Sequence, residues 1–250
     1  AGHAVTPYGG HLDPTVFQRL APGVMPLSVA EGIANGVPDV IACVRYQIRH
    51  GAKLIKVSAS GGVMSHSTAP GAQQYSDAEF AAIADEAHRA GVRVAAHAVG
   101  DSAIQACIRA GIDCIEHGPG LALEQVEQMA AAVVALVPTV MQTDKFPGFA
   151  AQGREKFPAY AATMDQLHAR RREVLMSAHE AGVPLYVGSD GGGAQRHGHL
   201  AGEVLAMAQL GMPAADVLAA ASWKAREWLG FDGLVEGAGA DFLVYDRDPA

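Results

Sequence analysis

The sequence predicts an α/β fold built on a parallel β-sheet, and two patterns point to it. Short, continuously apolar segments recur along the chain, as is typical of parallel strands that are buried on both faces. Between these segments lie amphipathic helices that end at glycine residues. Alternation of this kind builds right-handed βαβ units on one sheet. With 250 residues, half of them apolar, the chain can bury a substantial core.

Five segments are predicted to be strands: Lys53–Ala59, Val92–Val99, Ile112–His117, Val133–Val140 and Val183–Ser189. Four helices are predicted between them, at about Ser76–Ala90, Asp101–Gly111, Leu123–Ala131 and Ala159–Ala181. The first of these helices has Ser76 and Glu79 at capping-box spacing. A closed (β/α)₈ TIM barrel needs eight strands. We therefore expect an incomplete barrel in which strands four to eight are present.

The two ends of the chain differ in pattern from its middle. The opening AGHAVTPYGGHLDP is rich in glycine and proline and is predicted to be a loop, whereas GLVEGAGADFLVYDRDPA at the other end is predicted to form a turn and one strand. We expect residues 1–230 to form the partial barrel domain. Residues 231–250 are expected to begin a small C-terminal β-sandwich domain.

Composition narrows the range of partners. The net charge of -8 argues against a nucleic-acid partner, which would favour a basic surface. No apolar run reaches the roughly 18 residues that span a bilayer. The three cysteines, Cys43, Cys107 and Cys114, are odd in number and lie in apolar segments, so we expect reduced core thiols. A cytoplasmic location is the resulting expectation, and the protein could assemble as a homo-oligomer.

Four residues of metal-ligand type lie at or near the carboxyl ends of predicted strands: Lys56, His97, His117 and Asp190. The carboxyl ends of the strands form the active-site face of a (β/α)₈ barrel. Burying such groups together without a partner would cost several kcal/mol per ion. A bound cation removes that cost, because imidazole and carboxylate are ligands of first-row metals. The pattern therefore predicts a metal site.

The motifs around these residues are specific when taken together. IKVSASGG, AAHAVG, IEHG and VGSD occur in this order and resemble the strand-end motifs of the amidohydrolase superfamily. The segments QYS and ADFLVYDRDP also resemble its imidazolonepropionase-like and Xaa-Pro dipeptidase-like branch. The resemblance covers nearly the whole chain. It implies a TIM barrel of the metal-dependent hydrolase type.

This resemblance implies a role for each of the four residues. Lys56 would be carboxylated by CO₂ and would bridge two divalent metals, usually zinc. His97 and His117 would bind one metal, and Asp190 would bind the other and act as proton shuttle. The two metals would activate a hydroxide that attacks an amide or peptide bond. Because mononuclear imidazolonepropionase-type enzymes generally lack the bridging lysine, Lys56 favours a dipeptide substrate over a cyclic amide.

Two further residues are candidates for substrate binding. His11 lies in the glycine-rich segment YGGHLD, which lines the active site in members of the family that the sequence resembles. Tyr75 could direct its hydroxyl at the substrate, or it could cover the apolar base of the helix that follows. Both interpretations of Tyr75 remain open at this stage.

The sequence also departs from the family pattern. The family's first metal site uses an H-x-H pair on the first strand, and no predicted strand carries one. His197 and His199 have this spacing but follow the last predicted strand, so we interpret them as a surface or substrate-loop pair. Val99 stands where many members have Tyr or His, which puts a contact to a dipeptide carboxylate in doubt.

Two alternative functions remain. IKVSASGG also resembles the strand that carries the Schiff-base lysine of class I aldolases, in which Lys56 would act as a neutral amine. That alternative does not explain His97, His117 and Asp190. The other alternative is an inactive, truncated barrel, because a sheet that lacks strands would expose apolar edges.

Overall fold

A four-stranded parallel sheet lies at the centre of the computed structural model, which describes residues 1–13, 32–62, 69–192, 195–244 and 246–247. Its strands pair in chain order and are β1 (Leu54–Ser58), β2 (Arg93–Ala98), β3 (Cys114–His117) and β4 (Ala135–Val137). All three pairings are parallel. This arrangement confirms the α/β class and the first four predicted strand positions.

Short pairings extend the sheet on both sides. Next to β1, Val5 forms a parallel bridge with Val57, and its N–H donates to the Lys56 carbonyl at 2.7 Å. The opening segment, predicted to be a loop, thus contributes to the sheet. Next to β4, the predicted strand Val183–Ser189 forms only one bridge, between Leu185 and Leu136. That prediction was right in position and too long in extent.

The fourth strand is also shorter than the predicted range Val133–Val140. Val133 ends the preceding helix in a left-handed conformation, with φ of 56°. Pro138 follows the strand and has no N–H to donate to a ladder. Thr139 then turns with φ of 46°, and helix α6 (Val140–Thr143) begins. The apolar pattern of this range therefore did not reveal the two left-handed residues, Val133 and Thr139, that flank the strand.

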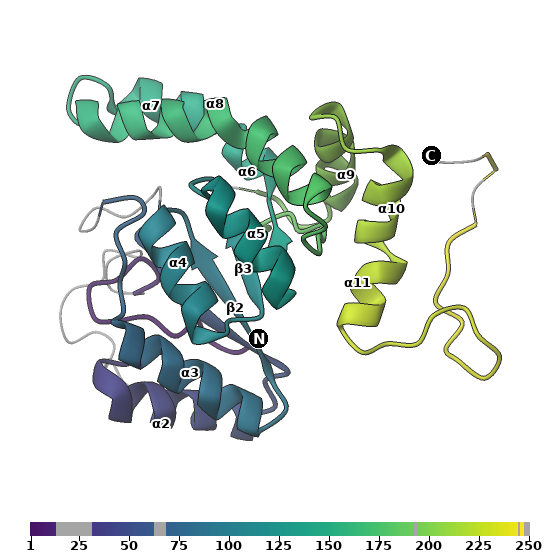
Figure 1. Cartoon of the computed structure of the whole chain (residues 1–250), viewed down its shortest axis with the longest axis horizontal. Helices are drawn as coiled ribbons and strands as arrows, with labels where there is room; N and C mark the ends of the chain where they lie inside the picture. The colour runs from purple at the N-terminus through teal and green to yellow at the C-terminus, as the bar shows by residue number, and fades with distance from the viewer. Residues whose placement is uncertain (14–31, 63–68, 193–194, 245, 248–250) are drawn as a thin grey trace.

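Helices α2 (Gly36–Arg49), α3 (Asp77–Arg89), α4 (Asp101–Ala110) and α5 (Leu123–Ala132) pack side by side over one face of the sheet (Figure 1). The last three confirm the predicted helices. The capping box before α3 is present, because the Ser76 hydroxyl accepts from the Glu79 N–H and Glu79 Oε2 accepts from the Ser76 N–H at 2.8 Å.

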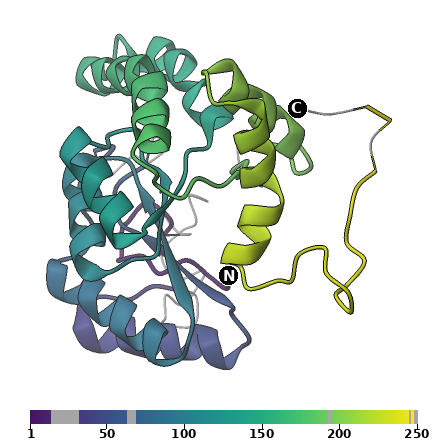
Figure 2. The same cartoon turned by 45° about the vertical axis from the view of Figure 1, so that its right-hand side comes forward.

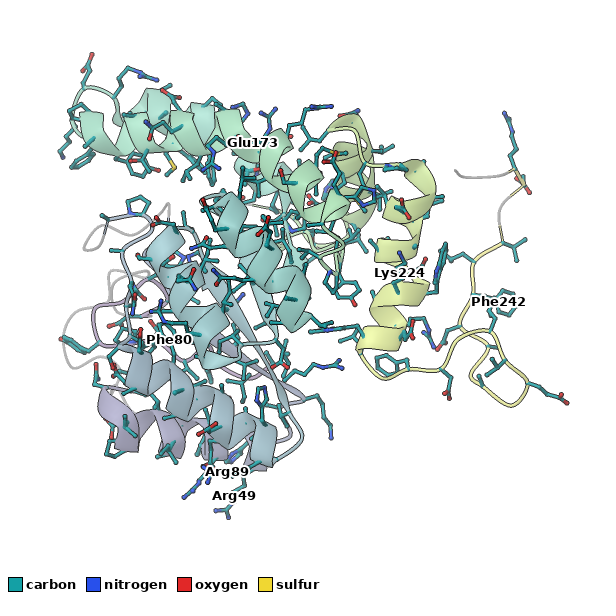
Figure 3. The ribbon with its side chains drawn as sticks, viewed as in Figure 1. Arg49, Phe80, Arg89, Glu173, Lys224 and Phe242 are labelled. Atoms are coloured by element: carbon teal, nitrogen blue, oxygen red, sulfur yellow. The ribbon has the colours of Figure 1, made fainter. Side chains whose placement is uncertain are left out.

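The main core lies between this helix layer and the sheet. One residue of each strand points into it, and these register partners are fully buried: Val57, Ala96, Ile115 and Leu136. Phe80 of α3 packs against them from the helix layer (Figure 3). Because successive strand residues alternate between faces, the polar residues Lys56, His97 and Glu116 occupy the opposite face.

The remaining helices are α7 (Phe146–Gly153), α8 (Pro158–Glu180), α9 (Leu200–Gln209), α10 (Ala214–Ala221) and α11 (Trp223–Trp228). Helices α7 and α8 form a hairpin with an apolar cluster of its own, which includes Phe146 and Met164. Figure 2 shows α10 and α11 on the side of the sheet opposite to α2–α5. Of the described helices, none combines the length and the apolar character that crossing a membrane requires.

The described residues after α11 form neither helix nor strand. Their apolar side chains face solvent; Leu234 is 80% exposed and Phe242 is 60% exposed (Figure 3). The strand expected within GLVEGAGADFLVYDRDPA is therefore not formed in the described part of that segment. A separate β domain at residues 231–250 stays a prediction.

Candidate active site

Polar side chains from neighbouring strands meet on the face of the sheet that the helices α2–α5 leave open. His97 of β2 is the register partner of Glu116 in β3 and of Ser58 in β1. Lys56, two residues before Ser58, forms an ion pair with Glu116. Strand register therefore places His97 beside Glu116 near the carboxyl ends of β2 and β3, and the ion pair with Glu116 adds Lys56 from β1.

His117 joins this group through an irregular backbone. In a regular strand, Glu116 and His117 would point to opposite faces. His117 has φ of 69°, in the left-handed region that residues other than glycine rarely adopt. Its ring consequently lies edge-on to the ring of His97, with 4.8 Å between the centroids.

A third imidazole belongs to the opening segment of the chain. The ring of His11 stacks on that of His97 with 4.3 Å between centroids, and His11 is only 8% exposed. The His11 N–H donates to Gln74 Oε1, which also accepts from the Ser58 hydroxyl at 3.1 Å. Gly62 packs against the imidazole, because a Cβ at this position would overlap the His11 ring.

Burial determines the charge of the three imidazoles. It lowers the pKa of His11 to about 4 and that of His117 to about 3, and the nearby Lys56 ammonium acts in the same direction. Burial also lowers the pKa of His97 well below its ordinary value, with further lowering by His117 and His11. All three rings are therefore neutral near pH 7, the form in which imidazole can bind a metal.

Two of the imidazoles have the hydrogen-bonding pattern of metal ligands. The Nε2 atom of His97 is buried and has no hydrogen-bond partner among the described residues, while the Gly61 backbone hydrogen-bonds the ring. His117 Nδ1 lies 2.7 Å from Thr139 Oγ1. In metal sites, one ring nitrogen binds the ion and the other is held by an outer hydrogen bond. Both rings fit this description.

Lys56 and Asp190 complete the set predicted from the sequence. Burial lowers the pKa of Lys56 to about 8, and the Asp190 carboxylate acts in the opposite direction, so the two charges lie within electrostatic reach. Asp190 itself is exposed and has φ of 49°. Three of the four described non-glycine residues with positive φ, His117, Thr139 and Asp190, thus follow or end parallel segments at this site. Such backbone strain concentrates at functional sites.

Other predicted residues are not brought to this cluster. The Tyr75 side chain is 2% exposed, its hydroxyl donates to the Ala34 carbonyl at 2.9 Å, and its ring contacts Phe80 edge-on. This favours the second interpretation of Tyr75, in which it covers the base of α3, and corrects the substrate-binding one. His197 and His199 are exposed, as expected for a surface loop.

The donor chemistry fits divalent metals, although the geometry is not that of a finished metal centre. Across the described ranges, no group of three or more His, Cys, Asp or Glu side chains is arranged to hold one ion. The unpartnered Nε2 of His97 and the neutral imidazoles are nevertheless available as donors. A metal at this site is therefore a proposal that rests on these donors.

Three residues of this region were missed by sequence reasoning. Glu116 precedes His117 directly; it is the register partner of His97 and forms the ion pair with Lys56, and no motif of its own indicated either contact. Thr139 was assigned to a strand interior, which hid its hydroxyl contact with His117. Glu203 is fully buried in α9 and carried no motif that was recognised.

Comparison with known proteins agrees with this geometry. A protein-family model described as the amidohydrolase family matches residues 15–250. An uncharacterised protein of Mycobacterium tuberculosis is 47% identical over 176 residues, which are 70% of this chain and 47% of that protein. Ochratoxinase of Aspergillus niger is 37% identical over 158 residues, which are 63% of this chain and 32% of that enzyme.

The fold is similar as well. A crystal structure of a Xaa-Pro dipeptidase with bound methionine superposes with a TM-score of 0.81 and 28% identity, covering 92% of this chain and 56% of that one. The chain spans about half the length of the curated relatives it matches. Sequence motifs, the parallel sheet and the family model agree, and the chain belongs to the amidohydrolase family.

Proposed function

We propose that the protein is a metal-dependent hydrolase that cleaves the carbon–nitrogen bond of a dipeptide-like amide. The observation that carries this proposal is the cluster of neutral imidazoles beside Lys56, in which the Nε2 atom of His97 is buried without a partner. An unsatisfied buried nitrogen costs free energy unless a ligand occupies it. A divalent cation is the ligand that suits several neutral imidazoles at once.

The proposed roles follow from the position of each side chain. His97 and His117 would hold one ion through Nε2, and Asp190 would hold a second. A pair of divalent ions, zinc being the expected one, would polarise the substrate carbonyl and lower the pKa of a water molecule. Lys56 would bridge the ions as a carbamate, formed when its neutral amine bonds to the carbon of CO₂ and releases a proton.

The state of Lys56 supports carbamate formation. Burial lowers the pKa of Lys56 to about 8, so a larger fraction of this lysine is a neutral amine at pH 7 than of an ordinary, exposed lysine. Only the neutral amine reacts with CO₂. The carbamate is anionic and would lie beside Glu116, which pairs with the ammonium when Lys56 is unmodified. Bound cations would offset that repulsion, so carboxylation and metal binding should depend on each other.

Asp190 is proposed to move the proton during the reaction. Its carboxylate would accept a proton from the attacking water as the new carbon–oxygen bond forms. It would then donate the proton to the amide nitrogen as the carbon–nitrogen bond breaks, releasing an amine and a carboxylic acid. The exposed position of Asp190 at the open side of the cluster is compatible with access to both water and substrate.

The substrate class follows from the family and the site. The solved neighbour is a Xaa-Pro dipeptidase and a curated relative is an ochratoxinase. We infer an amide whose acyl or amine part is an amino acid, with His11 contacting the substrate. The Schiff-base alternative shares the lowered pKa of Lys56, but it gives the three imidazoles no task and does not explain the family match.

The experiment is metal removal from the purified protein, with Xaa-Pro dipeptides and ochratoxin as substrates. Dialysis against a chelator should abolish amide hydrolysis, and zinc should restore it. Growth with ¹³C-bicarbonate should give a carbamate signal that Lys56→Met loses and that Lys53→Met, at an exposed lysine, keeps. Full hydrolysis after verified metal removal would contradict the proposal, as would a borohydride-trapped adduct of a carbonyl substrate on Lys56.

A further inference from the structure

Glu203 is a buried carboxylate that lies far from the histidine cluster in the sequence. Its side chain reaches the turn that follows β4. The residue belongs to α9 and is fully buried. One carboxylate oxygen accepts from the Val140 N–H, and the other accepts from the Met141 N–H at 2.9 Å. Helices α6 and α9 are in contact (Figure 1). Glu203 therefore caps the start of α6 from outside that helix.

The need for this external cap arises from Thr139. Thr139 is the residue before α6, where a threonine hydroxyl commonly accepts a hydrogen bond from the first helical N–H groups. Here the side chain makes no such bond: Thr139 has a left-handed backbone, whereas an N-cap residue is usually extended, and its Oγ1 is hydrogen-bonded to Nδ1 of His117 at 2.7 Å. The Thr139 hydroxyl is hydrogen-bonded to the His117 imidazole, and the Glu203 carboxylate accepts the hydrogen bonds of the first helical N–H groups.

A carboxylate is a costly choice for a purely structural cap. Removing an ionised carboxylate from water costs several kcal/mol, of which two backbone hydrogen bonds return only a part. Burial accordingly raises the pKa of Glu203 to about 7, and the Asp144 carboxylate acts in the same direction. A neutral cap at position 139 would avoid this cost, but an N-cap residue is usually extended, so Thr139 would have to give up its left-handed conformation.

We propose that Glu203 is a positioning residue for His117: by holding the start of α6 it fixes Thr139 in its left-handed conformation and keeps the hydroxyl on the imidazole. This inference rests on the proposed function, in which His117 holds a metal ion. Outer hydrogen-bond partners of metal-binding histidines fix the tautomer and the ring orientation. Glu203 acts one step further out, through the backbone of Val140 and Met141.

The test compares Glu203→Ala, Thr139→Val and the double variant in the full chain. Cobalt is the probe, because its visible spectrum reports ligand geometry and its titration gives an affinity. Each single variant is expected to weaken cobalt binding about 10-fold to 100-fold. The double variant should lose little more than Thr139→Val, because both changes act through one hydrogen bond. Independent, additive losses would overturn the proposal.

Two controls separate positioning from stability. Met207→Ala removes a buried side chain from the same helix but leaves both hydrogen bonds from Val140 and Met141 to Glu203 in place, so it should lower the unfolding free energy and leave cobalt affinity unchanged. Glu127→Gln alters an exposed carboxylate and should change neither. If Met207→Ala weakens cobalt binding as much as Glu203→Ala does, Glu203 is merely structural.

A second measurement keeps the inference distinct from the proposed function. Imidazole ¹⁵N NMR of the metal-free protein reports the tautomer of His117 directly. Glu203→Ala should convert a single tautomer into a mixture even if the wild type binds no cobalt. Absence of cobalt binding by the wild type would thus count against the metal proposal, whereas an unchanged His117 tautomer in Glu203→Ala would refute the positioning role.

Discussion

The Nδ1 atom of His117 lies 2.7 Å from the hydroxyl oxygen of Thr139, and both residues have a left-handed backbone. They end or follow neighbouring strands, β3 and β4, so two strained turns face each other across the sheet edge. A left-handed backbone costs about 1–3 kcal/mol at each residue, and the surrounding contacts must stabilise the folded chain by at least as much. In the tautomer that carries its proton on Nδ1 and donates it to the hydroxyl, Nε2 of His117 is left with a lone pair that can bind a metal ion.

Thr139→Val should therefore lower metal affinity more than it lowers the stability of the fold. Valine keeps the shape of threonine and removes the hydroxyl, so the imidazole loses the bond that fixes its tautomer. We expect zinc affinity to fall about 10-fold to 100-fold, measured by competition with a chromophoric chelator. Thr139→Ser retains the hydroxyl and is the matched control. Equal zinc affinities in the valine and serine variants would contradict this account.

Gly62→Ala is expected to separate His11 from His97. A Cβ at position 62 would overlap the His11 ring, which is buried and stacked on His97 at 4.3 Å. Forcing an extra methyl group into a packed site costs about 1–3 kcal/mol, measurable by urea denaturation. The control is Gly148→Ala, where the added Cβ meets no atom within 4 Å. His11→Ala in the Gly62→Ala background should recover stability, and failure to do so would place the strain elsewhere.

The sequence was sufficient for the parts of the fold that local patterns determine. Apolar segments located β1, β2 and β3, and glycine stops located the ends of α3, α4 and α8. The ends of strands were harder to predict, because Val133–Val140 is apolar at nearly every position, yet the strand ends at Val137, before Pro138 and Thr139. Apolar character reports burial, and a buried turn can be as apolar as a buried strand.

For the candidate site too, the sequence indicated only the residues that have a local motif. Residues with a motif of their own, His97 and His117, could be found from the sequence, and the structure brings their rings together. Glu116 and Glu203 could not be found in this way. Glu116 acts through the strand register, and Glu203 contacts a turn 63 residues earlier in the chain. Contacts between distant segments have no local signature.

Ser76→Ala tests the local signal that the sequence carried most clearly. The change removes the hydroxyl that accepts from the Glu79 N–H at the start of α3, and this loss typically costs about 1 kcal/mol. Urea denaturation should show that loss, with metal affinity unchanged because α3 covers the opposite face of the sheet. Ser102→Ala, at an exposed serine within α4, should leave stability within about 0.5 kcal/mol of the wild type. An unchanged unfolding free energy in Ser76→Ala would mean that the capping box contributes no measurable stability.

The raised pKa of Glu203 predicts a pH dependence of stability with a definite sign. Its pKa is about 7 in the folded chain and 4.5 for the ordinary group. Between these values the folded state binds more protons than the unfolded state, so stability contributed by protonated Glu203 is complete below pH 4.5 and is lost as pH rises through 7. The loss is on the order of 3 kcal/mol. Glu203→Gln has no such titration.

The measurement is the difference in unfolding free energy between wild type and Glu203→Gln, taken by urea denaturation at several values of pH from 4.5 to 8. Taking the difference cancels the buried histidines, whose lowered pKa values make stability rise with pH in both proteins. The wild type should become steadily less stable relative to the variant as pH rises, and Glu127→Gln should show no trend. A difference that is constant with pH would mean that Glu203 stays ionised throughout, held by the Val140 and Met141 N–H groups.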